Sequence, residues 1–210
     1  MKDKILQVIY RIGFIVSNHP IDIFRRQLKK INIAFKAGWV SKKFAKCGKN
    51  FSIEPIYTIV GHECITIGDN FASRAGLRLE AHATHKGETF TPEIIIGDSV
   101  ALNFDCHIGC INRIVIGNNV LMASKIFITD HFHGNTEVSI LNMPPARRKL
   151  YSKGPVVIED NVWIGEGVVI MPNVTIGKNS IIGANAVVTK SFPENSIIAG
   201  NPAKLVRIIE

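Results

Sequence analysis

Apolar residues recur every six positions toward the C-terminus, and polar or small residues fill most positions between them. From Ile158, every sixth residue is apolar, at Ile164, Ile170, Ile176, Ile182 and Val188. A period of six matches neither the helical repeat of 3.6 residues nor the strand repeat of two. It predicts a chain that turns a corner every six residues and buries one residue on each side. This is the pattern of a parallel β-helix, in which each coil covers the inner residues of the next.

The same rhythm appears in two earlier stretches, with one change of frame. Apolar residues lie in register at Ile96, Leu102, Ile108 and Ile114, and a slip of two residues resets the frame to Ile116, Met122 and Ile128. A looser version runs through Ile53, Ile59, Ile65 and Phe71. We therefore expect residues 51–210 to form an all-β solenoid with three sides to each coil. A conventional sandwich would instead show alternation broken by turns every 8–12 residues.

Residues 1–50 lack this rhythm, and their apolar residues recur at helical spacing, which predicts a helical N-terminal segment. The segment carries 12 Lys and Arg against Asp3 and Asp22, a net charge of +10, whereas the rest of the chain has 13 against 15, a net charge of −2. Two interpretations stay open for it. It can cover the open first coil of the solenoid, or it can bind peripherally to an anionic membrane surface. It has no recognised nucleic-acid-binding motif, and we expect no nucleic-acid partner.

Composition narrows the remaining classes. No apolar run approaches the ~18 residues that a transmembrane helix needs. The apolar stretch Ile5–Val16 is interrupted by Gln7 and Arg11, so we expect no signal peptide. Four cysteines in 210 residues do not suggest a disulfide framework, and the pair Cys106 and Cys110 has no partner pair that would make a zinc site. These features favour a cytoplasmic protein with reduced thiols.

The longest interruption of the rhythm spans residues 129–154 and reads TDHFHGNTEVSILNMPPARRKLYSKG. Loops of this length inside a compact domain are usually functional or disordered. This one begins with Asp130, His131 and His133 and later carries the basic residues Arg147 and Arg148. Imidazoles and a carboxylate at the base of a loop, fixed on a rigid coil, predict a general-base site.

From Ile96 onward the chain resembles the hexapeptide-repeat acyltransferases, in particular the galactoside and maltose O-acetyltransferases and related enzymes that modify bacterial polysaccharides. The strings that carry the resemblance are IGDSVALNFDCHIG, IVIGNNVLMASKIFITDHFHG, GPVVIEDNVWIGEGVVIMPNVTIG, IIGANAVVTK and AGNPAKLVR. It is strong over residues 95–210, weak over 51–94 and absent before that. It implies a left-handed parallel β-helix, a homotrimer, and acetyl-CoA bound as co-substrate in the groove between neighbouring subunits, with no metal ion.

The resemblance also implies roles for single residues on the acceptor side. The stretch from Gly97 to His133 aligns with the galactoside enzyme without a gap, so that His133 falls on the family's catalytic histidine. His131 lies two residues earlier and is the second candidate, and Asp130 would orient whichever imidazole acts. Asn103 falls on the asparagine that positions the acceptor hydroxyl, with Asp105 close to it. Arg147 and Arg148 would bind an acidic sugar, a lipid-linked diphosphate or the cofactor's 3′-phosphate, or would simply be solvated.

On the coenzyme side, Trp163 falls on the tryptophan that lines the acetyl-CoA groove. Three residues match positions where the thin pantetheine arm would lie flat: Ala184, Thr189 and Lys190. Lys204 and Arg207 match basic positions near the phosphates, where a polyanionic ligand needs cations.

Together these features predict an acetyl-CoA-dependent O-acetyltransferase that acts on a sugar hydroxyl of a cell-surface polysaccharide or its precursor, either free in the cytoplasm or at the inner face of the membrane. An N-acetyltransferase for an amino sugar, or a drug-modifying enzyme, would share the base and the groove. A metal-dependent hydratase on the same solenoid would need His82, His85 and His107 to converge at a subunit seam. A non-catalytic scaffold would leave Asn103, His133 and Trp163 without a role.

Overall fold

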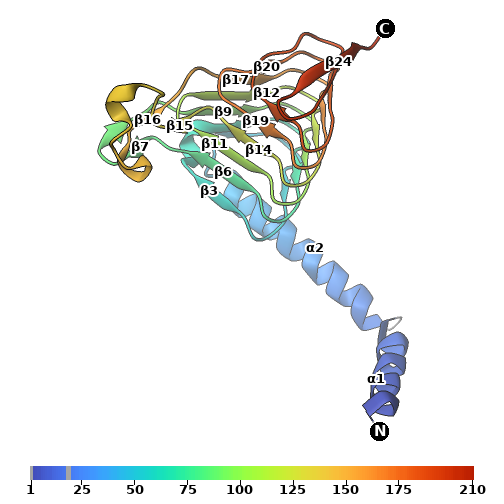
Figure 1. The fold of residues 1–210 in the computed structure, drawn as a ribbon. Coiled ribbons are helices and arrows are strands. Elements are labelled where there is room, and N and C mark those ends of the chain that lie inside the picture. The colour runs from blue at the N-terminus through green and yellow to red at the C-terminus, as the bar shows by residue number, and fades with distance from the viewer. Residues whose placement is uncertain (1, 18–19) are drawn as a thin grey trace.

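Three sheets form the sides of a solenoid, and the chain visits them in turn, coil after coil (Figure 1). Their strands are parallel except for the last, β24, which pairs antiparallel with β23. The computed structural model describes residues 2–17 and 20–210. Sheet A contains β1 (Lys46–Cys47), β4 (Ile65–Ile67), β9 (Glu93–Ile96), β12 (Arg113–Ile116), β17 (Val156–Ile158) and β20 (Thr175–Ile176). Sheet B contains β2 (Ser52–Ile53), β5 (Ala72–Ser73), β10 (Ala101–Leu102), β13 (Leu121–Met122), β18 (Trp163–Ile164), β21 (Ile181–Ile182), β23 (Ser196–Ala199) and β24 (Lys204–Ile208). Sheet C contains β3 (Thr58–Val60), β6 (Arg78–Ala81), β11 (His107–Cys110), β14 (Phe127–Thr129), β19 (Val169–Ile170) and β22 (Val187–Val188).

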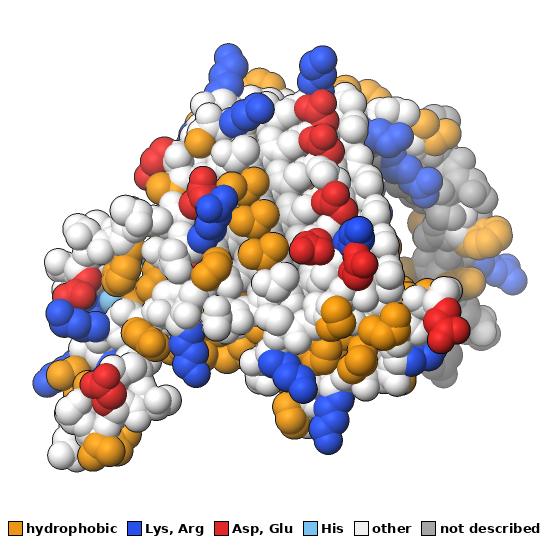
Figure 2. Space-filling view, turned by 90° about the horizontal axis from the view of Figure 1, so that it is seen from above, with side chains coloured by type: hydrophobic (Ala, Val, Ile, Leu, Met, Phe, Trp, Pro, Cys, Tyr) orange, Lys and Arg blue, Asp and Glu red, His pale blue; other side chains and the backbone are white. Residues whose placement is uncertain are grey.

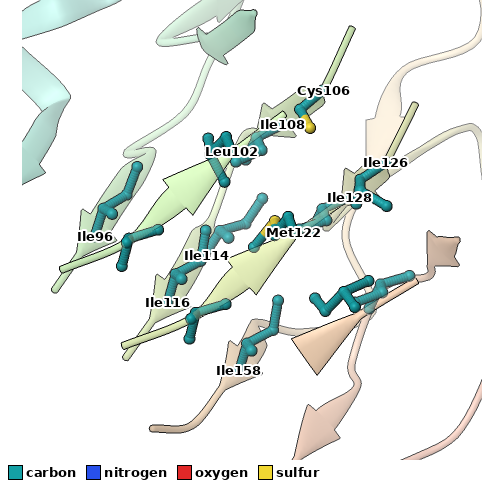
Figure 3. Close-up of a cluster of buried hydrophobic side chains, with 14 of the residues drawn as sticks. Ile96, Leu102, Cys106, Ile108, Ile114, Ile116, Met122, Ile126, Ile128 and Ile158 are labelled. Carbon is teal, nitrogen blue, oxygen red and sulfur yellow. The ribbon is translucent and has the colours of Figure 1, made fainter. Parts of the chain in front are cut away.

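The six-residue rhythm marks the core, as the sequence predicted. Every member of the series from Ile158 to Val188 is at most 1% exposed. Successive coils stack these residues in register, so that Ile96, Ile116 and Ile158 lie one above another on sheet A (Figure 3). The frame slip has a simple cause. Ile96 pairs with Ile116, 20 residues later, so this coil is two residues longer than three hexads, and Ile114 is a second inward residue of β12. The core is therefore a stack of apolar layers closed on three sides.

Residues in the left-handed backbone conformation turn the corners between the sheets, and most of those that are not glycine are asparagines. Asparagine tolerates this conformation better than other residues with a side chain. Four of these asparagines also bond to one another along one edge. The side chains of Asn119, Asn161, Asn179 and Asn195 form a ladder with N–O distances of 3.0–3.1 Å. The ladder satisfies amides that would otherwise interrupt the stacking of the coils.

Two excursions leave the solenoid at the corner that follows sheet C, after β6 and after β14, with the coil of β11 between them. The first is the hairpin of β7 (Thr84–His85) and β8 (Glu88–Thr89). The second contains β15 (Phe132–His133) paired antiparallel with β16 (Leu150–Tyr151), and between them the short helices η2 (Val138–Ile140) and η3 (Pro145–Arg147). An ion pair of 2.6 Å between Lys149 and Glu88 joins the two. Figure 2 shows the two excursions projecting from the body of the solenoid, on the side away from the N-terminal helices.

Two α-helices precede the solenoid, α1 (Lys2–Ser17) and α2 (Pro20–Ser41). A short 3-10 helix, η1 (His62–Cys64), interrupts the early coils. Only the C-terminal end of α2 and the residues after it cover the first coil, through Ala37, Val40 and Phe44, which are buried in the common core. The rest of α2 and all of α1 extend away from the solenoid (Figure 1). Within the described ranges, no helix combines the length and apolarity needed to cross a bilayer.

Candidate active site

Asp130 and His131 form a hydrogen-bonded pair where sheet C ends and the second excursion begins. The Asp130 side chain is fully buried, and its Oδ1 lies 3.0 Å from Nδ1 of His131. The same carboxylate accepts the backbone N–H groups of Ile111 at 3.0 Å and Asn112 at 2.8 Å. The Cys110 thiol donates to it at 3.2 Å. The preceding coil therefore holds the carboxylate in place, and the carboxylate holds the imidazole.

These contacts decide the charge of Asp130 and the tautomer of its partner. Burial raises the pKa of Asp130, but the hydrogen bonds from His131 and from the backbone N–H groups outweigh it, and the pKa lies below its ordinary value. An anionic carboxylate at Nδ1 assigns the proton of a neutral imidazole to that nitrogen and leaves Nε2 as the acceptor. Burial raises the pKa of the Cys110 thiol, so that it remains a protonated donor. The arrangement presents one basic nitrogen in a fixed orientation.

His133 lies two residues further on, in the hairpin of the excursion, and its side chain is exposed. Its ring meets His85 edge-on, with centroids 5.9 Å apart. Among the described residues its imidazole has no hydrogen bond or ion pair. The structure thus joins Asp130 to His131 and leaves His133 without a carboxylate that would orient it.

Gly109 leaves room for one methyl group between two imidazoles. A Cβ atom at Gly109 would stand 3.5 Å from Cε1 of His131 and 3.6 Å from Nε2 of His107, which are ordinary contact distances. The neighbouring outward positions in the same register are Glu80 and Thr129, which carry side chains. Glycine therefore keeps the space beside the basic nitrogen free.

A second carboxylate and imidazole form the far wall of this space. Oε2 of Glu80 lies 2.9 Å from Nε2 of His107, and Arg78 donates to both oxygens of the same carboxylate. Burial raises the pKa of Glu80, but the hydrogen bonds from Arg78 and His107 lower it by more. The pKa of Glu80 therefore lies below its ordinary value. Burial and nearby Arg78 lower the pKa of His107, so that a neutral ring donates to an anionic carboxylate. His82 also faces Glu80, at 3.8 Å.

The three histidines proposed for a metal site do not form one group. His82 and His107 turn toward Glu80, whereas His85 meets His133. In the part of the chain that the structure describes, no three or more His, Cys, Asp or Glu side chains are arranged to bind a metal ion.

Asn103 and Asp105 lie at a different corner, where the chain passes from sheet B to sheet C. Nδ2 of Asn103 donates to the carbonyl oxygen of Met122 at 3.0 Å, and its side chain is half-buried. Asp105 has a φ of 58° and turns this corner, with its N–H donated to the carbonyl of Ala75 at 3.0 Å. Sheet C separates both residues from His131.

The two arginines of the excursion differ in what they contact. Arg148 donates to the carbonyl oxygens of Met143 at 2.8 Å and Leu141 at 3.3 Å, and so holds the excursion together. Arg147 is exposed at the end of η3. Of the two arginines, Arg147 is therefore the one that can reach a ligand without breaking a contact in the loop.

The residues expected at the coenzyme lie along sheet B and the last coils. Trp163 is 51% exposed and stands in register between Leu121 and Ile181 on the outer face of sheet B. A Cβ atom at Gly165 would come within 2.7 Å of the Ala184 backbone nitrogen, so that only glycine lets these two coils close together. The other four candidates, Thr189, Lys190, Lys204 and Arg207, are exposed.

One chain therefore carries two separate parts of a site. The pair Asp130 and His131 lies beyond the end of sheet C, whereas Trp163 and Asn103 belong to sheet B and the corner that follows it. Within the described residues, no hydrogen bond or ion pair joins these parts.

Several residues around the Asp130–His131 pair were not predicted from the sequence, and one signal could have found them. Strands β11 and β14 pair with an offset of 20 residues, as in Ile108 and Ile128. The same offset brings Cys110 and Asp130 together across neighbouring coils. Glu80 was harder to find, because the β7–β8 hairpin lengthens the offset to 29 residues at Leu79 and Ile108.

Comparison with known proteins matches the hexapeptide repeat to a family and larger parts of the chain to individual proteins. Residues 155–190 match the family described as bacterial transferase hexapeptide (six repeats). WbbJ of Escherichia coli, provisionally assigned as a lipopolysaccharide biosynthesis O-acetyl transferase, is 44% identical over 147 residues, which are 68% of this chain and 71% of WbbJ. The galactoside O-acetyltransferase of E. coli is 36% identical over 126 residues, 58% of this chain and 57% of that enzyme.

A solved structure extends the comparison to the fold. Galactoside acetyltransferase in complex with coenzyme A superposes with a TM-score of 0.57 at 27% identity, covering 92% of this chain and 74% of that one. The fold is the left-handed parallel β-helix that the resemblance implied. The repeat, the coils and the long match to WbbJ define the class as acyltransferases built on this solenoid. The chain belongs to the hexapeptide-repeat acetyltransferase family.

Proposed function

We propose that the protein is an acetyl-CoA-dependent O-acetyltransferase that acts on a hydroxyl of a sugar in a cell-surface polysaccharide or its precursor, with His131 as the general base. The observation that carries this proposal is the buried Asp130 carboxylate, 3.0 Å from Nδ1 of His131. A carboxylate in this position orients the ring and stabilises the imidazolium that forms when the base takes a proton.

The chemistry follows from the free nitrogen. A sugar hydroxyl is a weak nucleophile near neutral pH. Nε2 of His131 accepts the hydroxyl proton as the oxygen attacks the thioester carbonyl carbon. When the tetrahedral species collapses, the carbon–sulfur bond breaks, and the same imidazolium returns the proton to the departing thiolate. The acetyl group passes directly to the acceptor, and Asp130 stays ionised throughout.

The sequence placed His133 first and His131 second, and the contacts favour the reverse order. His131 has a buried carboxylate partner and a side chain only 14% exposed, whereas His133 is exposed in a hairpin. A general base needs a fixed orientation toward the proton that it accepts. Of the two imidazoles, His131 meets this requirement better.

We also propose that a homotrimer completes the site. The coenzyme candidate Trp163 and the acceptor candidate Asn103 lie on another side of the solenoid from His131, so that a neighbouring copy must supply one part. The exposed outer face of sheet B supports this, because Leu121 and Trp163 are 46% and 51% exposed beside each other. Acetyl-CoA would lie along this seam. Exposed Ala184, Thr189, Lys190, Lys204 and Arg207 follow on the same coils.

The acceptor class rests on the relatives. WbbJ carries a lipopolysaccharide assignment and the second relative acts on galactosides, which supports a sugar as acceptor. We propose the cytoplasm, at the inner face of the membrane, as the place of action, which the net charge of +10 in residues 1–50 supports.

The test is release of free coenzyme A thiol from acetyl-CoA against a panel of neutral and amino sugars. We expect a hydroxyl acceptor, with His131→Ala lowering kcat by about 10³-fold and His133→Ala changing it by less than about threefold. Loss of activity in His133→Ala alone would reverse the assignment. Turnover of amino sugars alone would identify an N-acetyltransferase. Absence of acetyl-CoA binding would refute the proposed function.

A further inference from the structure

Helix α2 has two apolar faces, and the chain covers only one of them. Ala37 and Val40 are buried against the first coil. A second set of apolar residues recurs at spacings of three or four, which places them on one side of a helix. Their exposed fractions are 47–74%, and we call them the apolar stripe: Phe24, Leu28, Ile31, Phe35 and Trp39. The stripe runs for most of the length of a helix that stands clear of the solenoid (Figure 1).

The stripe continues onto the solenoid at its C-terminal end. Phe35 and Trp39 line a shallow pocket together with Pro55, Ile56 and Tyr57. Ile56 is 82% exposed and has a φ of 69°. A β-branched residue is rarely found in this conformation, which costs free energy. An apolar side chain is therefore held out into solvent beside two exposed aromatic rings, so that helix and coil present one continuous apolar surface.

Positive charges accompany this surface. At 100° per residue, Lys29 and Lys36 follow one flank of the apolar stripe. The Lys43 ammonium lies 3.9 Å from the ring centre of Trp39. Long basic side chains can keep their charge in water while their methylene groups lie along apolar surface. An apolar stripe flanked by lysines, with aromatic residues in it, is typical of a helix that lies in the interface of a bilayer.

The charges also argue against a second copy of the chain as the occupant. Helices that pair through apolar stripes usually place opposite charges on the flanks of the seam. Helix α2 carries Arg25, Arg26, Lys29, Lys30 and Lys36 against a single acid, Asp22. Copies packed through the stripe would bring like charges together, whereas an anionic lipid surface would attract them.

We propose that the apolar stripe, together with Ile56, docks the protein onto an anionic membrane leaflet, with α2 lying in the plane of the surface. Helix α1 also carries an exposed apolar face. Its residues Ile5, Ile9 and Ile12 share one face and are 55–59% exposed. The proposal deepens the proposed place of action and does not depend on acetyl transfer, so its failure would leave the proposed acetyltransferase activity untouched.

The first test measures binding of the full-length protein to vesicles of phosphatidylglycerol and phosphatidylcholine, against vesicles of phosphatidylcholine alone, by cosedimentation at low salt. We expect binding to the anionic vesicles and its loss as salt rises. Lys29→Gln/Lys36→Gln should weaken binding about 25-fold, at about fivefold per charge. Lys86→Gln/Lys178→Gln, which removes the same charge from the solenoid side, should change it by less than about twofold.

The second test reports on the stripe itself. Leu28→Ser/Ile31→Ser should weaken binding about 100-fold, because each side chain leaves water on docking. In Trp163→Phe, Trp39 is the remaining tryptophan of the two in the chain, and its fluorescence should shift to shorter wavelength when anionic vesicles are added. Equal binding to neutral vesicles, or no shift, would overturn the proposal. If Leu28→Ser/Ile31→Ser lowered the sedimenting mass without lipid, the stripe would be an interface between copies.

Discussion

His131 and His133 carry the same imidazole two residues apart, yet they belong to different parts of the molecule. His131 stands at the end of a coil, where the backbone of the preceding coil fixes its carboxylate partner. His133 lies in the excursion hairpin and meets another imidazole. A repeat scaffold can give one residue a defined orientation while its neighbour in sequence stays adaptable. The chemistry of a side chain is thus set less by its type than by whether the coils hold its partner.

The sharpest way to break this comparison is to remove the charge that orients His131. Asp130→Asn should lower kcat by about 10²- to 10³-fold, because the imidazolium loses its counter-charge and the ring loses its preferred tautomer. Thiol release at saturating acetyl-CoA measures this. Asp98→Asn is the matched control, since Asn118 accepts a backbone N–H in the next coil just as Asp98 does. A kcat within threefold of wild type in Asp130→Asn would contradict the assignment.

A smaller change would fill the space beside the base. Gly109→Ala places a methyl group at ordinary contact distance from His131 and His107, so the fold should persist. We expect the KM for the acceptor to rise about tenfold, with the KM for acetyl-CoA nearly unchanged. The thermal midpoint serves as the control for folding. An unchanged acceptor KM would mean that the acceptor approaches His131 from another side.

The buried carboxylate should also make stability depend on pH. Since the pKa of Asp130 is lowered in the folded protein, its contribution is present above the ordinary aspartate value of about 3.9 and is lost as the pH falls toward the folded pKa. The free energy of unfolding of wild type should therefore exceed that of Asp130→Asn at pH 6, and the gap should narrow toward pH 3. Urea unfolding across this range checks the prediction. A constant gap would contradict it.

The smallest effect is expected within the excursion. Arg148→Ala removes two hydrogen bonds to loop carbonyls but none to a coil. We expect the thermal midpoint of the solenoid to change little and the acceptor KM to rise by no more than about threefold. Limited proteolysis should cut the loop faster than in wild type. A large loss of kcat would show that the excursion, too, holds the base.

The sequence was a good guide wherever the six-residue rhythm ran unbroken, because burial of one residue per side leaves a direct trace. It also brought Asp130, His131 and His133 forward as candidates, but it could not choose between the imidazoles. That choice depends on Ile111 and Asn112, which are 19 and 18 residues from Asp130 and contribute only backbone N–H groups. Backbone donors leave no mark in the residue types. Glu80 stayed hidden because a hairpin shifts its register with His107.

The pairing of β15 with β16 brings the two ends of the second excursion side by side, at Phe132 with Tyr151 and His133 with Leu150. Because the two ends of this segment lie side by side, the segment is an insertion that the solenoid can accommodate in different lengths. Its interior can be lengthened, shortened or replaced without altering the stacking of the coils, since closing a longer loop costs little extra entropy. A change of acceptor could therefore remodel this segment while Asp130, at its base, continues to hold His131.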